Sequence, residues 1–455
     1  ERKEEDRNRK KKSKGKDDIY QETTSTYRIF SRAFCNFVFP EENVKLGEKT
    51  FFLNRPMPKS DQTLEEAITT KKTKRDKEEG ITKKSSADED IVDGAGANDK
   101  LDNSDGLYTR EDIDDINKLN SEQTDSSYKS RIDFSLKLLE KNGSKYLSKS
   151  GLKQYGPKFL RVLNNILNPN NVGLHLIYSQ FRTLEGVGIL SLVLKQNGFA
   201  QFKISKSRPF KIDIAPEDEG KPMFGLYTGT ETVEEKEIIR NIFNGDWEKI
   251  PSSLSKELKK RTQNNNLGEI IKVLMITSSG SEGITLKNTR YVHLIEPYWH
   301  PVRTDQVIGR ARRICSHKDL PITPINLRTV EVFTYLMTFT DKQINGDKTA
   351  ERKEDQNPLV SQALKNSKAD KSKIDKTTVF TSDETLFEIS NIKKTTNNSI
   401  LKAIKESSID CVIHSKSNKK EGIACYSFGS PSTNTFSFKP NYSTEEKDSV
   451  EKQNY

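Results

Sequence analysis

The amino-acid sequence predicts an α/β protein built on a parallel sheet. Two apolar runs, Leu174–Tyr178 and Val273–Ile276, are typical of strands that are covered on both faces. Stretches with helical spacing of apolar residues alternate with such runs, and this alternation favours parallel strands joined by right-handed connections. We therefore expect one compact lobe, flanked and interrupted by long polar segments.

Composition limits how much of the chain can be core. Of the 455 residues, 32% are hydrophobic and 31% are charged, and the formal net charge is +10. This charge is consistent with a polyanionic partner, although lysine-rich composition also arises in genomes of low GC content for no binding reason. No apolar run approaches about 18 residues and there is no signal peptide, so we expect a soluble intracellular protein. The four cysteines suggest no disulfide framework.

The segments before the lobe differ sharply in composition. Residues 1–18 are nearly all charged and are interpreted as a disordered tail. Residues 19–58 begin with aromatic and apolar side chains, which could form a strand packed on a preceding domain, while the family resemblance described below implies a connector between two lobes. Residues 59–130 contain hardly any large apolar side chain, so we expect a disordered insert. Because the sequence begins with Glu1, we expect it to continue at the amino end.

We expect the lobe to span residues 131–345, followed by a charged linker at 346–375 and a mostly helical extension at 376–455. Amphipathic helices are predicted from Arg131 and over 158–167.

Inside the lobe, a helix over Val233–Phe243 should be capped by Thr232 or Thr230. Residues 244–270 are interpreted as a polar insertion, and a further strand is predicted over Val330–Leu336. The extension should contain two short helices, and His175, alone in an apolar strand, is interpreted as core.

The loop Thr277–Thr285 after the second strand combines small residues, hydroxyl groups and glycines. Open parallel sheets bind ligands outside the carboxyl ends of their strands, so this loop is a candidate for phosphate or ribose contact. The alternative is an ordinary turn that needs its glycines for backbone freedom.

Three polar residues recur at helical spacing further along. Gln306, Arg310 and Arg313 stand at i, i+4 and i+7, which predicts one helical face. Guanidinium groups pair bidentately with phosphate oxygens, so this face suits stabilising charge on a transferring phosphoryl group. The alternative is a solvated basic helix. Gly309 argues against it, because glycine lowers helix propensity by about 1 kcal/mol without evident structural gain.

Together these segments resemble the fifth and sixth motifs of superfamily 2 helicases and their Swi-Snf-like translocases. The string Gln306-x-x-Gly309-Arg310-x-x-Arg313 is similar to the arginine-finger motif, and the loop 277–285 is similar to the coupling loop. The stretches at 280–286, 296–300 and 314–317 resemble the helicases of nucleocytoplasmic large DNA viruses. That group includes the nucleoside triphosphate phosphohydrolase I and the early transcription factor ATPase subunit.

The resemblance implies a RecA-like lobe, the helicase C-terminal domain, with assigned site residues. Arg310 and Arg313 would be catalytic. The implied nucleotide contacts are Gly280, Glu282, Gly283, Thr285 and Gln306. The implied nucleic-acid contacts are Ser179, Arg182, Thr230 and Thr277. For Ser179 and Arg182 there is also a local reason, because a hydroxyl and helix-start N–H groups at a strand end can bind a phosphate.

The sequence lacks a Gly-x-x-x-x-Gly-Lys-Ser/Thr phosphate loop and a convincing Asp-Glu metal box. We therefore expect ATP and Mg²⁺ to be bound mainly by an amino-terminal lobe outside this chain. The resemblance implies an ATP-driven helicase or translocase acting on DNA or RNA in viral transcription, with viral RNA polymerase or transcription factors as partners and no membrane. It further implies the host cytoplasm, at viral factories, or the virion as its location, with the nucleus as an alternative.

Two other interpretations stay open. A chromatin remodeller of the Swi-Snf type would share the arginine motif but should have Gly-Gln where this chain has Cys315-Ser316. A non-catalytic module that keeps the lobe only for binding is favoured by the missing phosphate loop and disfavoured by the intact arginines. Cys411, His414 and Cys425 are three widely spaced ligands without a fourth, so no metal site is assigned.

Overall fold

A computed structural model describes eight ranges of the chain: 29–47, 49–56, 128–205, 210–229, 231–277, 283–340, 380–411 and 413–425. The expected tail at 1–18 and linker at 346–375 lie outside them, as does the expected insert at 59–130 up to residue 127. The described residues form two compact units. The first reaches Leu386 without Trp299–Pro301, and the second contains Trp299–Pro301 and the residues from Phe387 onward.

Six parallel strands form the centre of the first unit, in the order β4-β5-β6-β3-β7-β8. Their bounds are β3 Leu174–Tyr178, β4 Ala200–Gln201, β5 Met223–Tyr227, β6 Ile271–Ile276, β7 Thr289–Leu294 and β8 Glu331–Thr334. The central strands β3 and β6 are buried except at Lys272, which explains their mostly apolar sequences. The prediction of an α/β fold with a parallel sheet is confirmed.

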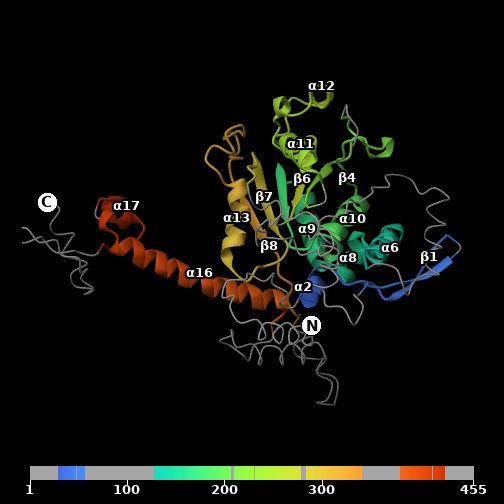
Figure 1. Cartoon of the computed structure of the whole chain (residues 1–455), viewed down its shortest axis with the longest axis horizontal. Coiled ribbons are helices and arrows are strands. Elements are labelled where there is room, and N and C mark those ends of the chain that lie inside the picture. Colours follow the sequence, from blue (N-terminus) through green and yellow to red (C-terminus); the bar gives the residue numbers. More distant parts are fainter. Residues whose placement is uncertain are drawn as a thin grey trace, which may run out of the picture. The chain divides into compact units, whose positions relative to one another are not determined.

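Helices cover both faces of the sheet, with α9 and α10 on one side and α13 on the other (Figure 1). In β6, Val273 and Met275 pack in one apolar cluster with α9 (Pro157–Leu167) and α10 (Ile189–Gln196). Leu274 and Ile276 point to the other face, because side chains alternate along a strand. There they share a second cluster with α11 (Val233–Phe243), α12 (Ser252–Arg261) and α13 (Pro301–Ala311).

The connector packs on the lobe itself. It consists of α2 (Ile29–Asn36) and the antiparallel strands β1 (Glu42–Leu46) and β2 (Lys49–Leu53). Phe37 and Leu53 are fully buried in the same cluster as α9. Three short helices complete this side of the lobe: α6 (Tyr128–Lys141), α7 (Gly143–Tyr146) and α8 (Lys149–Tyr155). The first begins three residues before the predicted Arg131.

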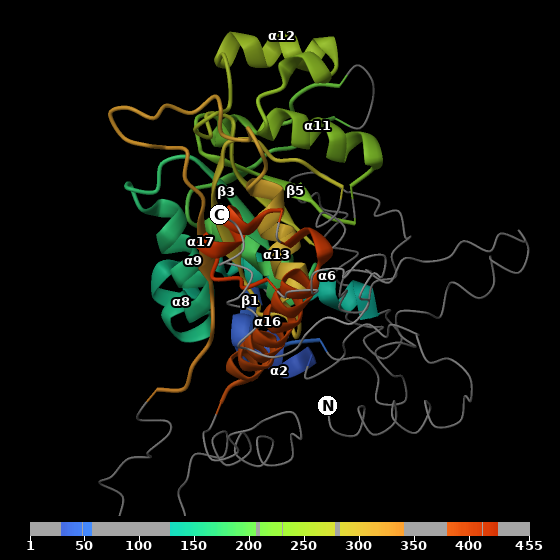
Figure 2. The same ribbon diagram turned by 90° about the vertical axis from the view of Figure 1, so that its left-hand side faces the viewer.

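Two local predictions can be compared directly with the structure. Thr232 caps α11 in a capping box, in which its hydroxyl accepts from the N–H of Glu235 and its own N–H donates to the Glu235 carboxylate. The segment 244–270, expected to be a polar insertion, is folded into the lobe through α12, whose Leu254 and Leu258 are fully buried. The two views show α12 beside α11 (Figure 2).

The prediction of two short helices in the extension is wrong. A single helix, α16, runs from Ser382 to Ser407, and the short α17 (Ser415–Lys420) follows. No glycine or proline interrupts α16, and its mid-helix Thr395, Thr396 and Ser399 donate to the carbonyls four residues earlier, which keeps their hydroxyls satisfied within the helix. None of the helices in the described ranges combines the length and the apolar character needed to cross a bilayer.

Candidate functional site

Helix α13, which carries Gln306 and Arg310, has one buried face and neighbouring side chains that are more exposed. Val307 and Ala311 of α13 are fully buried in the second apolar cluster. Gln306 is exposed and Arg310 is half-buried. This arrangement follows from the sequence, because apolar residues at i and i+4 fix which side of a helix faces the core.

The predicted single helical face is only partly correct, since α13 ends at Ala311 and Arg313 lies in the turn that follows. The hydroxyl of Ser316 donates to the Ala311 carbonyl over 3.0 Å, and Cys315 adopts a positive φ of 60°. These features end the helix, because they give its last carbonyls partners outside the helical ladder. Arg313 is exposed in this turn.

Arg310 and Arg313 nevertheless both contact the turn at Ile284 and Thr285. Nη1 of Arg313 donates a hydrogen bond to the hydroxyl of Thr285, and Nη1 of Arg310 donates to the carbonyl of Ile284 over 3.5 Å. The N–H of Leu286 in turn donates to the Arg310 carbonyl over 3.2 Å. Residues 284–286 at the end of the loop are therefore bonded directly to the arginine motif.

A second contact fixes this turn from the side of α11. The side chain of Asn244 donates to the Thr285 carbonyl over 3.0 Å and accepts from the N–H of Lys287 over 2.8 Å. Gly283 opens the described part of the turn with a φ of +72°, which L side chains rarely adopt. The exposed hydroxyl of Thr285 is thus presented to Arg313 by a backbone held on two sides.

Gly309 lies within α13, one residue before Arg310. A Cβ atom built at this position would meet no atom within 4 Å in the described part of the chain. Packing inside the lobe therefore does not explain why a helix interior carries glycine here. The smooth backbone surface next to Arg310 leaves room for a group from outside the described residues.

The remaining predicted contacts are placed as follows. Gly280, Glu282 and Thr230 lie outside the described residues. Thr277 follows β6 and is fully buried, and Arg182 is 8% exposed. The predicted nucleotide and nucleic-acid contacts stay predictions.

Ser179 lies inside a buried polar network rather than at the surface. Its hydroxyl donates to Oε1 of Glu296 over 2.8 Å, and the N–H of Gln180 donates to Oε2 over 2.8 Å. Asn36 of α2 donates to the same carboxylate over 2.5 Å. Burial raises the pKa of Glu296, while Lys158 and these donors oppose that rise. A direct contact of the Ser179 hydroxyl with a phosphate would require breaking its bond to Glu296.

Lys158 continues this network into α16. Its ammonium group donates to Oδ1 of Asn36 over 2.8 Å and to the Ile295 carbonyl over 3.2 Å, and it forms an ion pair with Asp383. Asp383 also accepts from the N–H of Met337 over 3.0 Å. Sequence reasoning missed Lys158, because a lysine in the first turn of an amphipathic helix looks like any solvated one.

His175 is fully buried, as predicted, but it is part of a chain of polar groups. Its Nδ1 lies 3.0 Å from Nε2 of His293, whose Nδ1 lies 2.7 Å from the hydroxyl of Tyr335. Asn165 donates to that hydroxyl over 2.8 Å. Burial lowers the pKa of His293 to about 3, so this imidazole is neutral at physiological pH.

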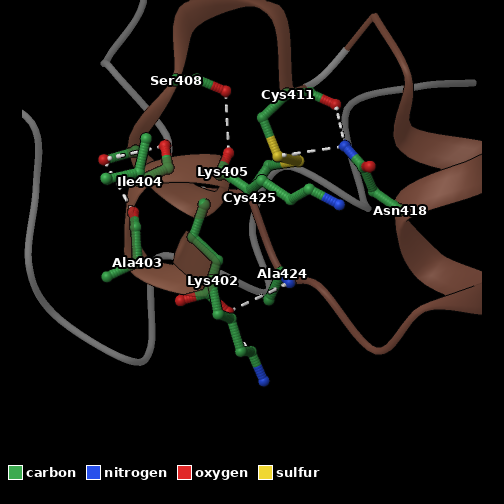
Figure 3. Close-up of a disulfide and its surroundings, with 11 residues drawn as sticks. Lys402, Ala403, Ile404, Lys405, Ser408, Cys411, Asn418, Ala424 and Cys425 are labelled. Atoms are coloured by element: carbon green, nitrogen blue, oxygen red, sulfur yellow. Dashed lines mark hydrogen bonds and ion pairs between the residues drawn. A yellow bond between two sulfur atoms is a disulfide. The ribbon is translucent and has the colours of Figure 1, made fainter. Parts of the chain in front are cut away.

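Cys411 and Cys425 form a disulfide in the second unit (Figure 3). The expectation that the cysteines form no disulfide is wrong for this pair. Spacing alone gave no signal, because 14 residues separate the two cysteines and nothing in the sequence indicates the turn that joins them. Their sulfur atoms are bonded to each other, so they are not metal ligands in this state. In the described ranges, no three His, Cys, Asp or Glu side chains are grouped to hold a metal ion.

Residues 212–315 match the family described as the helicase conserved C-terminal domain. Two proteins named as ATP-dependent RNA helicases of Acanthamoeba polyphaga mimivirus are similar to the chain. One is 26% identical over 330 residues, covering 72% of this chain and 46% of the relative. The other is 24% identical over 436 residues, covering 93% and 44%. A termination factor NPH-I homolog of African swine fever virus is 29% identical over 209 residues, covering 41% and 26%.

The matched residues 212–315 contain strands β5, β6 and β7 of the parallel sheet and the turn at Thr285 bonded to Arg313, so this part of the chain is similar to a helicase conserved C-terminal domain. Beyond this match, the chain is similar to proteins of large DNA viruses over up to 93% of its length. The chain spans less than half of the length of the relatives it matches.

Proposed function

We propose that the chain is the second motor lobe of an ATP-driven helicase or translocase that acts on DNA or RNA in the transcription of a large DNA virus. The observation that carries this proposal is the convergence of Arg310 and Arg313 on the turn at Ile284 and Thr285. Two guanidinium groups held by one rigid turn are suited to stabilise negative charge that develops on a phosphoryl group.

The arginines need a nucleotide held by another lobe. The chain has no phosphate loop, so ATP and Mg²⁺ would be bound mainly by a first lobe, while the exposed Arg313 reaches the γ-phosphate across the cleft. Thr285 orients Arg313, and Gln306 on the exposed part of α13 contacts the nucleotide. Gly309 leaves the backbone of α13 open to the first lobe. Gly280, Glu282 and Gly283 complete the loop that responds to the bound nucleotide.

Movement along nucleic acid would come from the ends of β3, β5 and β6. Arg182, Thr230 and Thr277 are proposed to follow the strand backbone as the cleft closes on ATP. Ser179 has a different role in this proposal, because its hydroxyl already donates to Glu296. It fixes the turn that presents the neighbouring groups.

We also propose partners and a location for this chain. The African swine fever virus relative is named as a termination factor, which favours viral RNA polymerase or transcription factors as partners of this chain. We place its work in the host cytoplasm, at viral factories, or in the virion, with the nucleus as the alternative. Cys315-Ser316 in place of Gly-Gln disfavours the chromatin remodeller.

An ATP turnover assay on residues 1–455 alone, with and without DNA or RNA, tests whether another lobe must bind the nucleotide. We expect no nucleic-acid-stimulated hydrolysis, because the arginines act on a nucleotide that another lobe must hold. A full-length protein with a phosphate loop is the positive control. Stimulated hydrolysis by the purified chain would refute the proposal, and a silent full-length protein would favour the binding module.

A further inference from the structure

The disulfide between Cys411 and Cys425 joins the turn that follows α16 to the segment that follows α17. Cys411 lies in the short turn Ile409–Cys411 that follows α16 and is 2% exposed. Cys425 lies in the segment that returns from α17 and is half-buried. Figure 3 shows the two sulfur atoms bonded beside the last turn of α16. The two halves of the bond therefore differ in their exposure to solvent.

The other described contacts between the returning segment and the end of α16 are polar. None of the residues of α17 is buried, so no apolar core supports it. The ion pair of Lys405 with Glu421 spans 2.9 Å, but both side chains are more than half exposed, and such pairs contribute little to stability. The N–H of Ala424 reaches the Glu406 carboxylate only at 3.5 Å. The disulfide is therefore the principal link between this segment and α16.

Asn418 adds a chemical feature to this link. Its side-chain amide donates to the Cys411 carbonyl over 2.9 Å and lies 3.4 Å from Sγ of Cys411. An N–H donor beside a sulfur atom stabilises the thiolate form, and a stabilised thiolate is a better leaving group in thiol–disulfide exchange. Sγ of Cys411 is thus the better leaving group in thiol–disulfide exchange. Sγ of Cys425, on the more exposed residue, is the atom that a reductant can attack.

We propose that Cys411–Cys425 is a reversible thiol switch that releases residues 413–425 from the end of α16 when it is reduced. A small dithiol attacks Sγ of Cys425 as a thiolate, and the S–S electron pair leaves with Cys411, which takes up a proton from solvent. The second thiol of the reductant then attacks the mixed disulfide, frees Cys425 and becomes a disulfide itself. Two electrons pass from the dithiol to the protein. The assignment does not depend on the proposed motor function.

Hydrogen exchange on the whole chain, before and after dithiothreitol, tests the release. The background variant is Cys315→Ser, which removes the exposed free thiol, while burial raises the pKa of Cys35 to about 12 and keeps that thiol unreactive. We expect exchange in 413–424 to become at least about tenfold faster on reduction, with no change in β3, and to recover on reoxidation. A Cys411→Ser, Cys425→Ser variant should exchange fast with or without dithiothreitol.

The rate of reduction tests the role of Asn418. In the Asn418→Ala variant, dithiothreitol should reduce the Cys411–Cys425 disulfide several-fold more slowly than in the wild type. In Asn418→Asp the reduction should be slower still, because a carboxylate beside Sγ of Cys411 disfavours the thiolate. Three outcomes would overturn the proposal: free Cys411 and Cys425 in protein purified without reductant, unchanged exchange in 413–424 on reduction, or protection of the reduced segment by added zinc, which would indicate a metal site.

Discussion

Lys158 and Asp383 form an ion pair in the interior of the lobe, although 225 residues separate them in the sequence. The two side chains are 2% and 0% exposed. Through Asn36 and Glu296, the same set of contacts reaches the turn after β3. One buried polar network therefore holds together the connector, the carboxyl ends of β3 and β7, and the first turn of α16.

The first prediction concerns this ion pair. Lys158→Met should lower the free energy of unfolding by about 3–5 kcal/mol, because it leaves the buried carboxylate of Asp383 without its counter-charge. The matched control is Lys145→Met, whose partner Glu42 and own side chain are 36% and 60% exposed, and which should change stability by about 0–1 kcal/mol. Urea titrations followed by fluorescence measure both. Similar small losses for the two variants would mean that the network contributes little to stability.

The second prediction concerns acid stability. Burial lowers the pKa of His293 to about 3 from an ordinary 6.5. Between these two pH values the unfolded chain binds a proton at His293 and the folded chain does not. The stabilisation is therefore complete above pH 6.5 and is lost as the pH falls toward 3. Between pH 7 and pH 5 the loss from this group should be about 2 kcal/mol. His175, whose pKa burial also lowers, acts in the same direction.

A His293→Gln variant checks the assignment. It removes the titrating group but keeps an amide that can bond Tyr335, so its unfolding free energy should depend less on pH than that of the wild type, by about the same 2 kcal/mol. Urea titrations at pH 7 and pH 5 on both proteins give the difference. Parallel pH dependence in the two proteins would rule out a neutral buried imidazole.

The third prediction separates two glycines. Gly309→Ala should stabilise the isolated chain by about 0.5–1 kcal/mol, because alanine favours the helix and its Cβ meets nothing within 4 Å. In the full-length protein the same change should lower ATP turnover, since the smooth surface is proposed to meet the first lobe. Gly283→Ala should destabilise the chain by about 1 kcal/mol, because φ is +72° there. Unimpaired turnover by Gly309→Ala would show that nothing packs on this surface.

Much of the site could be predicted because it depends on local sequence. The apolar runs of β3 and β6 specify buried strands, and the glycine turn and the arginines lie within 30 residues of one another. The end of α13 was less predictable, because it depends on Ser316 bonding back to Ala311. The network around Lys158 could not be predicted, since the burial of a charged residue is decided by partners far along the chain. The disulfide could not be predicted for another reason, because nothing in the sequence indicates the turn that brings Cys411 and Cys425 together.

The central claim is that Arg313 acts on the transferring phosphoryl group, and the most direct measurement is ATP turnover by the full-length protein at saturating nucleic acid. Arg313→Ala should lower kcat by about 10³-fold or more with nucleic-acid affinity nearly unchanged. Arg313→Lys should restore little, because an ammonium cannot reproduce the planar fork. The control is the exposed neighbour in Arg312→Ala, which removes the same charge and should keep a normal kcat. Weakened, salt-dependent nucleic-acid binding with a normal kcat in Arg313→Ala would contradict the claim and identify a merely basic surface.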